Sequence, residues 1–227
     1  MVTLNPQDPM TETELTALLI LATATSFTPG PNTTLSTALA ANRGLRGALH
    51  FVCAVPVGWG LLFMLCAAGL GALVVAVPLL RWGILAGGLA YLLWLASRLA
   101  RTRSLSQADS TRLNVTFWQG VALQFLNIKA WMLALAVVAG WVAGRPDATA
   151  RTLQILPLMV AFGFFSNLLY ALVGSLLRGW LAGPVVQGVA TGGRLLVFNR
   201  FMAGVLVLTA AWMGASALGF SATGPTS

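Results

Sequence analysis

The sequence predicts an all-α integral membrane protein with six transmembrane helices arranged as two inverted three-helix repeats. Hydrophobic residues make up 58% of its 227 positions and charged residues 8%, whereas soluble domains carry about 25% charged residues. Several apolar runs reach or exceed the ~20 residues that cross a bilayer as a helix. Polar, helix-interrupting sequences occur at corresponding positions of the two halves, a pattern typical of transporters.

The charged residues that bound these runs divide a single transmembrane domain, residues 1–227, into its spans. The second run is longer than one span requires, so its helix is expected to end near residue 76, before an apolar turn at Pro78. The Gly-rich stretch from Gly179 to Asn199 is expected to form a loop or a short interfacial helix. The six spans cover about residues 15–41, 49–76, 79–100, 117–143, 153–177 and 201–220.

A weak internal repeat relates the two halves. Phe27–Asn32 in the first span corresponds to Gln124–Lys129 in the fourth, and Ala86–Gly87 in the third corresponds to Ala203–Gly204 in the sixth. Each half has three spans, and because three is odd, the two halves must have opposite orientations in the membrane.

The basic residues lie mainly in connections between the spans, which explains the net charge of +8 without nucleic-acid binding. Nine arginines follow the first, third and fifth spans and three follow the second and fourth, so the nine are expected to be cytoplasmic. This arrangement predicts a bacterial inner-membrane protein with both termini in the periplasm. The nine are Arg43, Arg46, Arg98, Arg101, Arg103, Arg112, Arg178, Arg194 and Arg200, and the three are Arg81, Arg145 and Arg151.

The sequence disfavours several other functions. Cys53 and Cys66 lie ~20 Å apart along one helix, too far for a disulfide, so a membrane thiol-redox carrier is disfavoured. A divalent-cation exporter needs intramembrane carboxylates, and no acidic residue after Glu14 lies within a predicted span. A non-transport scaffold would leave the break and the buried charge described below unexplained. The acidic N-terminus does not resemble a signal peptide, so the first run is expected to remain as a span.

The first span is expected to be broken at Pro29-Gly30-Pro31, because two prolines remove two backbone donors and glycine adds freedom. The new half-helix that follows offers N–H groups that attract a carboxylate. The carbonyls around Phe27 and Thr28 could take an ammonium group. One break thus offers both halves of an amino-acid site, although a simple kink remains the structural alternative.

Lys129 is the only charge well inside a span, and an intramembrane ionisable residue indicates function by default. It could bind a substrate carboxylate, carry a proton, or hold helix ends together structurally. Gln124 and Asn127 are its expected polar neighbours. The candidate substrate-binding residues are Thr28, Pro29, Gly30, Pro31, Asn32, Thr33, Gln124, Asn127 and Lys129, and no catalytic residue, metal ligand or cofactor is expected.

Three further features have open interpretations. His50 fits an interfacial histidine better than a proton shuttle. Ser166 and Asn167 could line a pathway but are expected mainly to join helices. Gly83-x-x-x-Gly87 fits a close helix contact, either within the bundle or between the subunits of a homodimer.

These motifs together resemble the lysine exporter (LysE/RhtB) family of bacterial amino-acid exporters, from about residue 16 to residue 218. The resemblance rests on Thr28–Asn32, on Tyr91–Leu95 in the third span and on Asn127-x-Lys129. Phe117-Trp118 and the motif Ala122–Lys129 resemble its cysteine/O-acetylserine exporter branch in particular. The usual family pattern is Asn-Pro-Lys. Here Ile128 replaces the proline, so the fourth span is expected to be broken less sharply than the first.

The resemblance implies an inner-membrane secondary transporter, not an enzyme, that exports small neutral amino acids. It also implies proton coupling, by antiport. The expected partners are therefore a small amino-acid substrate, protons and the lipid bilayer. Neither the identity of the amino acid nor the direction of transport follows from the residues alone.

Overall fold

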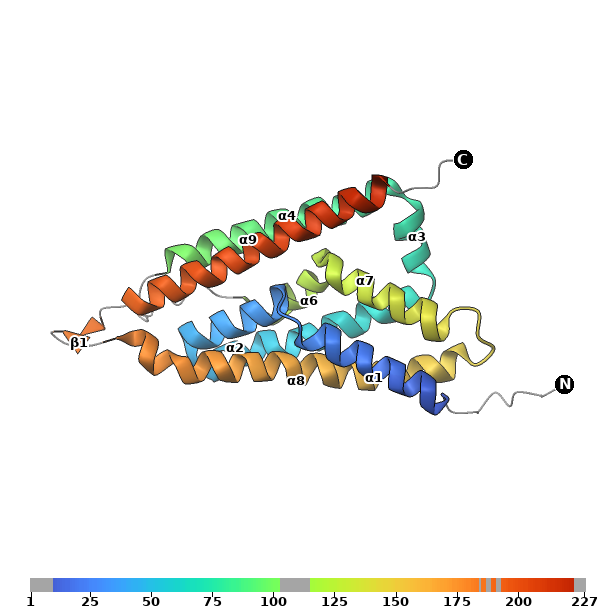
Figure 1. The fold of residues 1–227 in the computed structure, drawn as a ribbon, viewed down its shortest axis with the longest axis horizontal. Coiled ribbons are helices and arrows are strands. Elements are labelled where there is room, and N and C mark those ends of the chain that lie inside the picture. Colours follow the sequence, from blue (N-terminus) through green and yellow to red (C-terminus); the bar gives the residue numbers. More distant parts are fainter. Residues whose placement is uncertain (1–9, 103–114, 184, 187–188, 191–192, 223–227) are drawn as a thin grey trace.

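The computed structural model describes residues 10–102, 115–183, 185–186, 189–190 and 193–222 (Figure 1). The described chain is helical apart from one two-stranded antiparallel hairpin, which confirms the α-helical class. The helices are α1 (Glu12–Phe27), α2 (Pro31–Ala67), α3 (Leu70–Ala76), α4 (Pro78–Arg101), α6 (Phe117–Leu126), α7 (Ile128–Val137), the π-helical η1 (Val138–Val142), α8 (Ala148–Ala182) and α9 (Gly193–Ala222), and the strands are β1 (Val185–Val186) and β2 (Val189–Ala190).

Four of the described helices are long and apolar enough to cross a membrane, and five spans result if the bent pair α6 and α7–η1 counts as one. Large apolar side chains such as Leu79, Leu176 and Trp118 are exposed on their helices, as expected where a surface faces lipid. The predicted six spans would require the 37-residue α2 to contribute to two of them. Gly44, with φ 74° and ψ 169°, interrupts α2 between its residues 31–43 and 45–67. The count of six remains a prediction.

Two sequence-based expectations need correction. Helical structure does end at Ala76, before α4 starts at Pro78, but it is not one helix: α2 ends at Ala67, because Gly69 adopts a left-handed conformation with φ 95°, and α3 starts a new helix. The stretch Gly179–Asn199 is not a loop throughout: α8 continues to Ala182 and α9 begins at Gly193, with the β1–β2 hairpin between them. Arg103 and Arg112, from the orientation argument, lie outside the described residues.

The helices of the two halves of the chain pack against each other. The most extensive contacts join α2 to α8, α4 to α9 and α2 to α6. In Figure 1, α4 and α9 run side by side along one edge, α1 and α8 lie along the other, and α6 and α7 lie between them. This packing brings the ends of α1 and α6, both of which stop in the middle of the molecule, close to one another.

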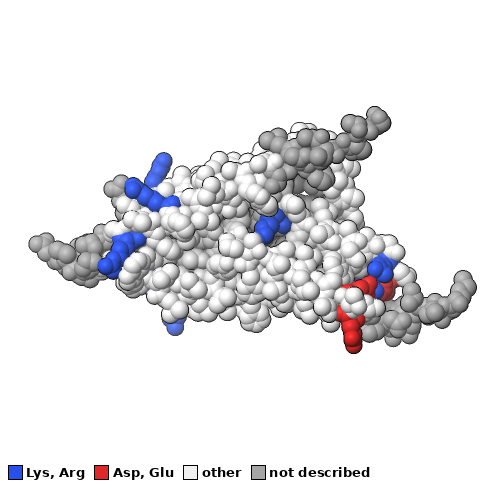
Figure 2. Space-filling model, in the orientation of Figure 1, with Lys and Arg blue, Asp and Glu red and all other residues white. Residues whose placement is uncertain are grey.

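One end of the molecule is basic and is held by a buried amide pair. The side chains of Asn42 and Asn199 donate to each other at 2.8 and 3.0 Å, and Asn199 also donates to the Thr102 carbonyl at 3.1 Å. All three residues are at most 2% exposed. Figure 2 shows Lys and Arg gathered at the end that carries the hairpin. Asn42 and Thr102, near the ends of the first and third expected spans, and Asn199, before the sixth, therefore meet at one end.

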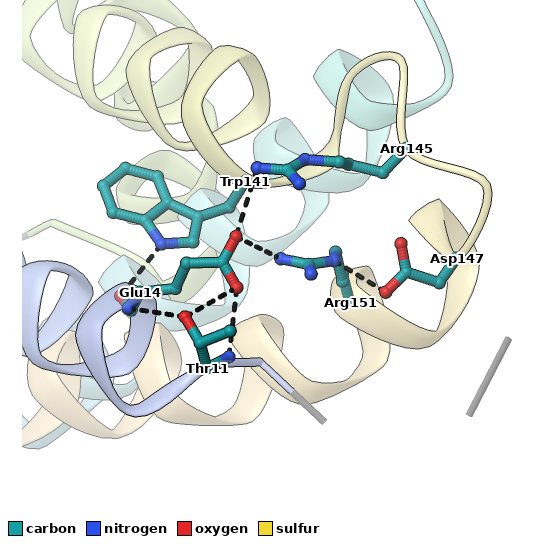
Figure 3. A network of polar contacts seen from close by, with 6 residues as sticks. All are labelled: Thr11, Glu14, Trp141, Arg145, Asp147 and Arg151. Atoms are coloured by element: carbon teal, nitrogen blue, oxygen red, sulfur yellow. Dashed lines mark hydrogen bonds and ion pairs between the residues drawn. The ribbon is translucent and has the colours of Figure 1, made fainter. Parts of the chain in front are cut away.

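The opposite end is held by charges (Figure 3). Glu14 forms ion pairs with Arg145 at 3.1 Å and Arg151 at 3.2 Å, and Arg151 also pairs with Asp147 at 2.7 Å. The Trp141 indole donates to the Glu14 carbonyl at 3.0 Å. The backbone N–H of Thr11 and the Arg151 guanidinium lower the pKa of the Glu14 carboxyl. This network fixes the start of α1 to the start of α8.

Candidate functional site

The chain breaks its first long helical stretch over three residues. Helix α1 ends at Phe27, Thr28 and Gly30 have extended backbones, and Pro31 occupies the first turn of α2. Proline is tolerated there because a first-turn N–H has no intrahelical acceptor. The predicted break at Pro29-Gly30-Pro31 is therefore present in the structure.

The two prolines leave α1 carbonyls without their usual donors. Pro29 and Pro31 lack the N–H groups that the Thr25 and Phe27 carbonyls would accept from in a continuous helix. The Tyr170 hydroxyl donates to the Phe27 carbonyl at 3.0 Å, and Lys129 Nζ donates to the Thr28 carbonyl at 3.3 Å. The Phe27 and Thr28 carbonyls, which the sequence suggested as partners of a substrate ammonium group, thus accept from a hydroxyl and an ammonium group of the protein itself. The Thr25 carbonyl, which lies next to the cavity described below, lacks the helical hydrogen bond from residue 29, because that residue is proline.

The other side of this break is the N-terminus of α2, which carries partial positive charge. Gly30 N–H donates to the Thr33 hydroxyl at 2.9 Å, and that hydroxyl donates to the Gly30 carbonyl at 3.1 Å. The amides of Asn32 and Gln124 bond each other in both directions at 2.9 and 3.2 Å. This amide pair joins α2 to α6 and brings the first break against the second.

The second break lies at Asn127, between α6 and α7, where the axis bends by 69°. The break is therefore sharp although Ile128 stands here in place of a proline. The Asn127 side chain caps α7 by accepting from the Lys129 N–H at 3.1 Å, and the Trp131 indole donates to the Phe125 carbonyl at 2.9 Å. Helix α4 also approaches closely, since a Cβ added to Gly88 would lie 1.9 Å from the Leu126 carbonyl oxygen. Side-chain capping and close packing therefore hold this break without a proline.

A cavity that is partly open to the outside lies between the two breaks, and the unfilled space there, with the open solvent at its mouth included, is about 610 Å³. It contains eight of the nine predicted site residues, and the ninth, Pro29, lines a neighbouring cavity together with Thr28, Gly30 and Lys129. Lys129 thus borders both cavities. The first cavity is lined by Thr25, Ser26, Thr28, Gly30, Pro31, Asn32, Thr33, Val55, Pro56, Trp59, Gln124, Asn127, Lys129, Ala130, Leu133, Met159, Gly163, Ser166 and Asn167.

Lys129 is the only charged residue in this lining. No carboxylate in the described part of the chain pairs with its ammonium group, whose hydrogen-bond partner is the Thr28 carbonyl. Asn127 contacts the Lys129 backbone, as expected for a neighbour, whereas Gln124 bonds Asn32 instead. A cation beside a helix N-terminus is suited to bind an anion such as a carboxylate.

Sequence reasoning missed several residues of this site. Tyr170 donates to the first break from α8, and Trp59 lines the cavity from α2. Asn167 joins helices as expected, accepting from Ser36 at 2.9 Å, yet it also lines the cavity. The sequence does show that Trp59 lies well inside an apolar run, away from the interfaces where tryptophan usually anchors.

Known proteins resemble this chain over most of its length. Residues 23–201 match the family described as LysE type translocator. Proteins named "Cysteine/O-acetylserine efflux protein" from Escherichia coli (strain K12), Escherichia coli O1:K1 / APEC and Shigella sonnei (strain Ss046) are 30% identical over 173 residues, which cover 74% of this chain and 86% of each relative. No solved structure is significantly similar. The chain therefore belongs to the LysE-type translocators, a family of transporters rather than enzymes.

Proposed function

We propose that this protein exports small neutral amino acids resembling cysteine and O-acetylserine across the bacterial inner membrane. The observation that carries the proposal is the meeting of two helix breaks beside the half-buried Lys129 in one cavity. Transporters place substrates at such interrupted helices, because the freed backbone groups bind charged groups without further side chains. The efflux activity named for the relatives agrees with this site.

The break provides complementary groups for both charges of an amino acid. The N-terminus of α2 and the Lys129 ammonium would bind the substrate carboxylate, and Asn32 and Thr33 lie in that first turn. The C-terminus of α1 carries partial negative charge, and its Thr25 carbonyl, which lacks an i+4 donor because residue 29 is proline, would accept from the substrate ammonium. The substrate side chain then extends toward the apolar lining of the cavity.

Transport is driven by proton antiport in this proposal. The two breaks come from different halves of the chain, in keeping with two inverted three-helix repeats that alternate around one site. Six spans place the basic, amide-held end in the cytoplasm and both termini, with the Glu14 network, in the periplasm. Homodimerisation belongs to the same proposal, but Gly83-x-x-x-Gly87 does not support it, because a Cβ at Gly87 would lie 3.3 Å from the Leu126 side chain of the same chain.

The central test is efflux of a labelled amino-acid panel from proteoliposomes, with and without an imposed pH gradient. Lys129→Met keeps the apolar stem and removes the charge. We expect it to fold normally yet lose transport at least ~10-fold, since a charge-assisted bond to the substrate is gone. Unchanged export by this variant would leave Lys129 a structural residue. Lys129→Arg separates the roles: coupled transport indicates a carboxylate partner, and binding without coupling indicates a proton role.

The orientation is tested with C-terminal fusions. The asymmetry of nine arginines against three predicts an active alkaline phosphatase fusion and a dark green fluorescent protein fusion. The reverse pattern would refute either the periplasmic C-terminus or the count of six spans.

A further inference from the structure

Trp59 lines the cavity between the breaks, and its indole N–H has no hydrogen-bond acceptor among the described residues. Its side chain lies in the second part of α2, is 7% exposed and stacks on Phe63 with ring centroids 5.3 Å apart. The indole Nε1 itself is buried. A buried donor without a partner destabilises the folded protein, so the unpaired Trp59 indole N–H needs an explanation.

Several other polar side chains in or beside the cavity have hydrogen-bond partners within the protein. The Trp131 indole donates to the Phe125 carbonyl, the Asn32 and Gln124 amides bond each other, and the Asn167 amide donates to the Gly163 carbonyl at 2.8 Å. Trp59 differs from these because nothing in the described protein accepts from it. An occupant of the cavity is the natural source of the missing acceptor.

The position of Trp59 indicates which part of the occupant it contacts. The helix of Trp59 and helices α7 and α8 give the cavity both apolar residues, such as Val55, Leu133 and Met159, and polar ones, such as Thr33, Lys129 and Asn167. The proposed carboxylate-binding groups are at the α2 N-terminus and Lys129, and an indole N–H cannot accept from an ammonium. The remaining part of an amino acid is its side chain. Trp59 is therefore assigned to a hydrogen-bond acceptor on the substrate side chain.

We propose that Trp59 selects substrates whose short side chain carries an oxygen acceptor, such as an ether, ester or hydroxyl oxygen. This inference rests on the proposed amino-acid export and specifies its substrate class. A site built to hydrogen-bond a substrate group rejects an analogue without that group, because the protein donor is then left buried and unpaired. The aromatic body of Trp59 contributes packing to any substrate, whereas its N–H contributes selectivity.

The test compares O-methylserine with norvaline, which have side chains of the same length and shape but differ by an ether oxygen in place of a methylene. Efflux of each is measured from proteoliposomes containing the full-length protein. We expect the wild type to prefer O-methylserine about 10-fold, the effect of leaving one buried donor unpaired. Trp59→Phe keeps the aromatic ring and removes the N–H. Whatever its absolute rates, this variant should bring the ratio of O-methylserine to norvaline export close to one.

Trp118→Phe is the matched control, because Trp118 is 73% exposed and does not line the cavity. It should keep the wild-type ratio. A wild-type ratio near one, or a ratio unchanged in Trp59→Phe, would overturn the role of Trp59 while leaving amino-acid export intact. Failure of the wild type to export either compound, together with the rest of the panel, would instead overturn the proposed function itself.

Discussion

The two helix breaks border the same cavity, but different interactions interrupt the helix at each of them. The first spans Thr28–Gly30 and follows from local sequence, because Pro29 and Pro31 cannot supply the N–H groups of a continuous helix. The second bends by 69° at Asn127 without any proline. It depends on a side-chain cap and on the close approach of α4 at Gly88. A broken helix can therefore be encoded in its own residues or imposed by its neighbours.

This difference determines how each break should respond to mutation. The first break should keep its backbone geometry when residues of neighbouring helices are changed, because that geometry is set by the two prolines. The second should be sensitive to residues outside the broken segment, since only tertiary contacts hold it. Three substitutions, in order of decreasing expected effect, test this contrast.

Gly88→Ala should have the largest effect, because its new Cβ would lie 1.9 Å from the Leu126 carbonyl oxygen at the second break. Either α4 must move away or the bend must change, and overpacking of this kind costs about 1–3 kcal/mol or more. The measurement is thermal unfolding in detergent together with transport. Gly83→Ala on the same helix is the control, since its Cβ would meet nothing within 4 Å. Equal behaviour of the two variants would contradict tertiary control of the second break.

Tyr170→Phe should cost about 1 kcal/mol in the free energy of unfolding, because it leaves the Phe27 carbonyl without its donor. Tyr91→Phe is the matched control: the Tyr91 hydroxyl is buried without a partner among the described residues, so its removal should be neutral or slightly stabilising. Chemical denaturation of both variants provides the comparison. If both lost the same stability, the Tyr170 hydroxyl would not support the first break.

Ile128→Pro should have the smallest effect, although it introduces proline into an apolar span. Ile128 is the first residue of α7, where proline is tolerated, and Asn127 already has the extended conformation that precedes proline, with φ −93° and ψ 103°. The free energy of unfolding should change by less than about 1 kcal/mol, and transport should persist. A large loss of stability or of transport would show that the second break cannot accept the proline chemistry that forms the first.

The same contrast explains what could be predicted from the sequence. The first break and Lys129 were accessible, because proline chemistry and a lone intramembrane charge act locally. The 69° bend of the second break could not be predicted, because nothing in Asn127-Ile128-Lys129 reveals that Gly88 of a distant helix packs on it. Trp59 and Tyr170 were missed for the same reason, since their hydrogen-bonding situation depends on which helices surround them. The end of the second helix at Ala67 was missed although Gly69 marked it.

The interleaved packing of the two halves has a consequence for how the chain can be divided. Helix α2 belongs to the first half but packs chiefly on α8, and α4 packs chiefly on α9. The buried pair of Asn42 and Asn199 fixes one register between the halves. The two largest clusters of buried apolar residues each combine residues from both halves, so the halves are not autonomous domains. A gene split between codons 102 and 115 should yield fragments that are unstable alone and reconstitute the transporter only when synthesised together.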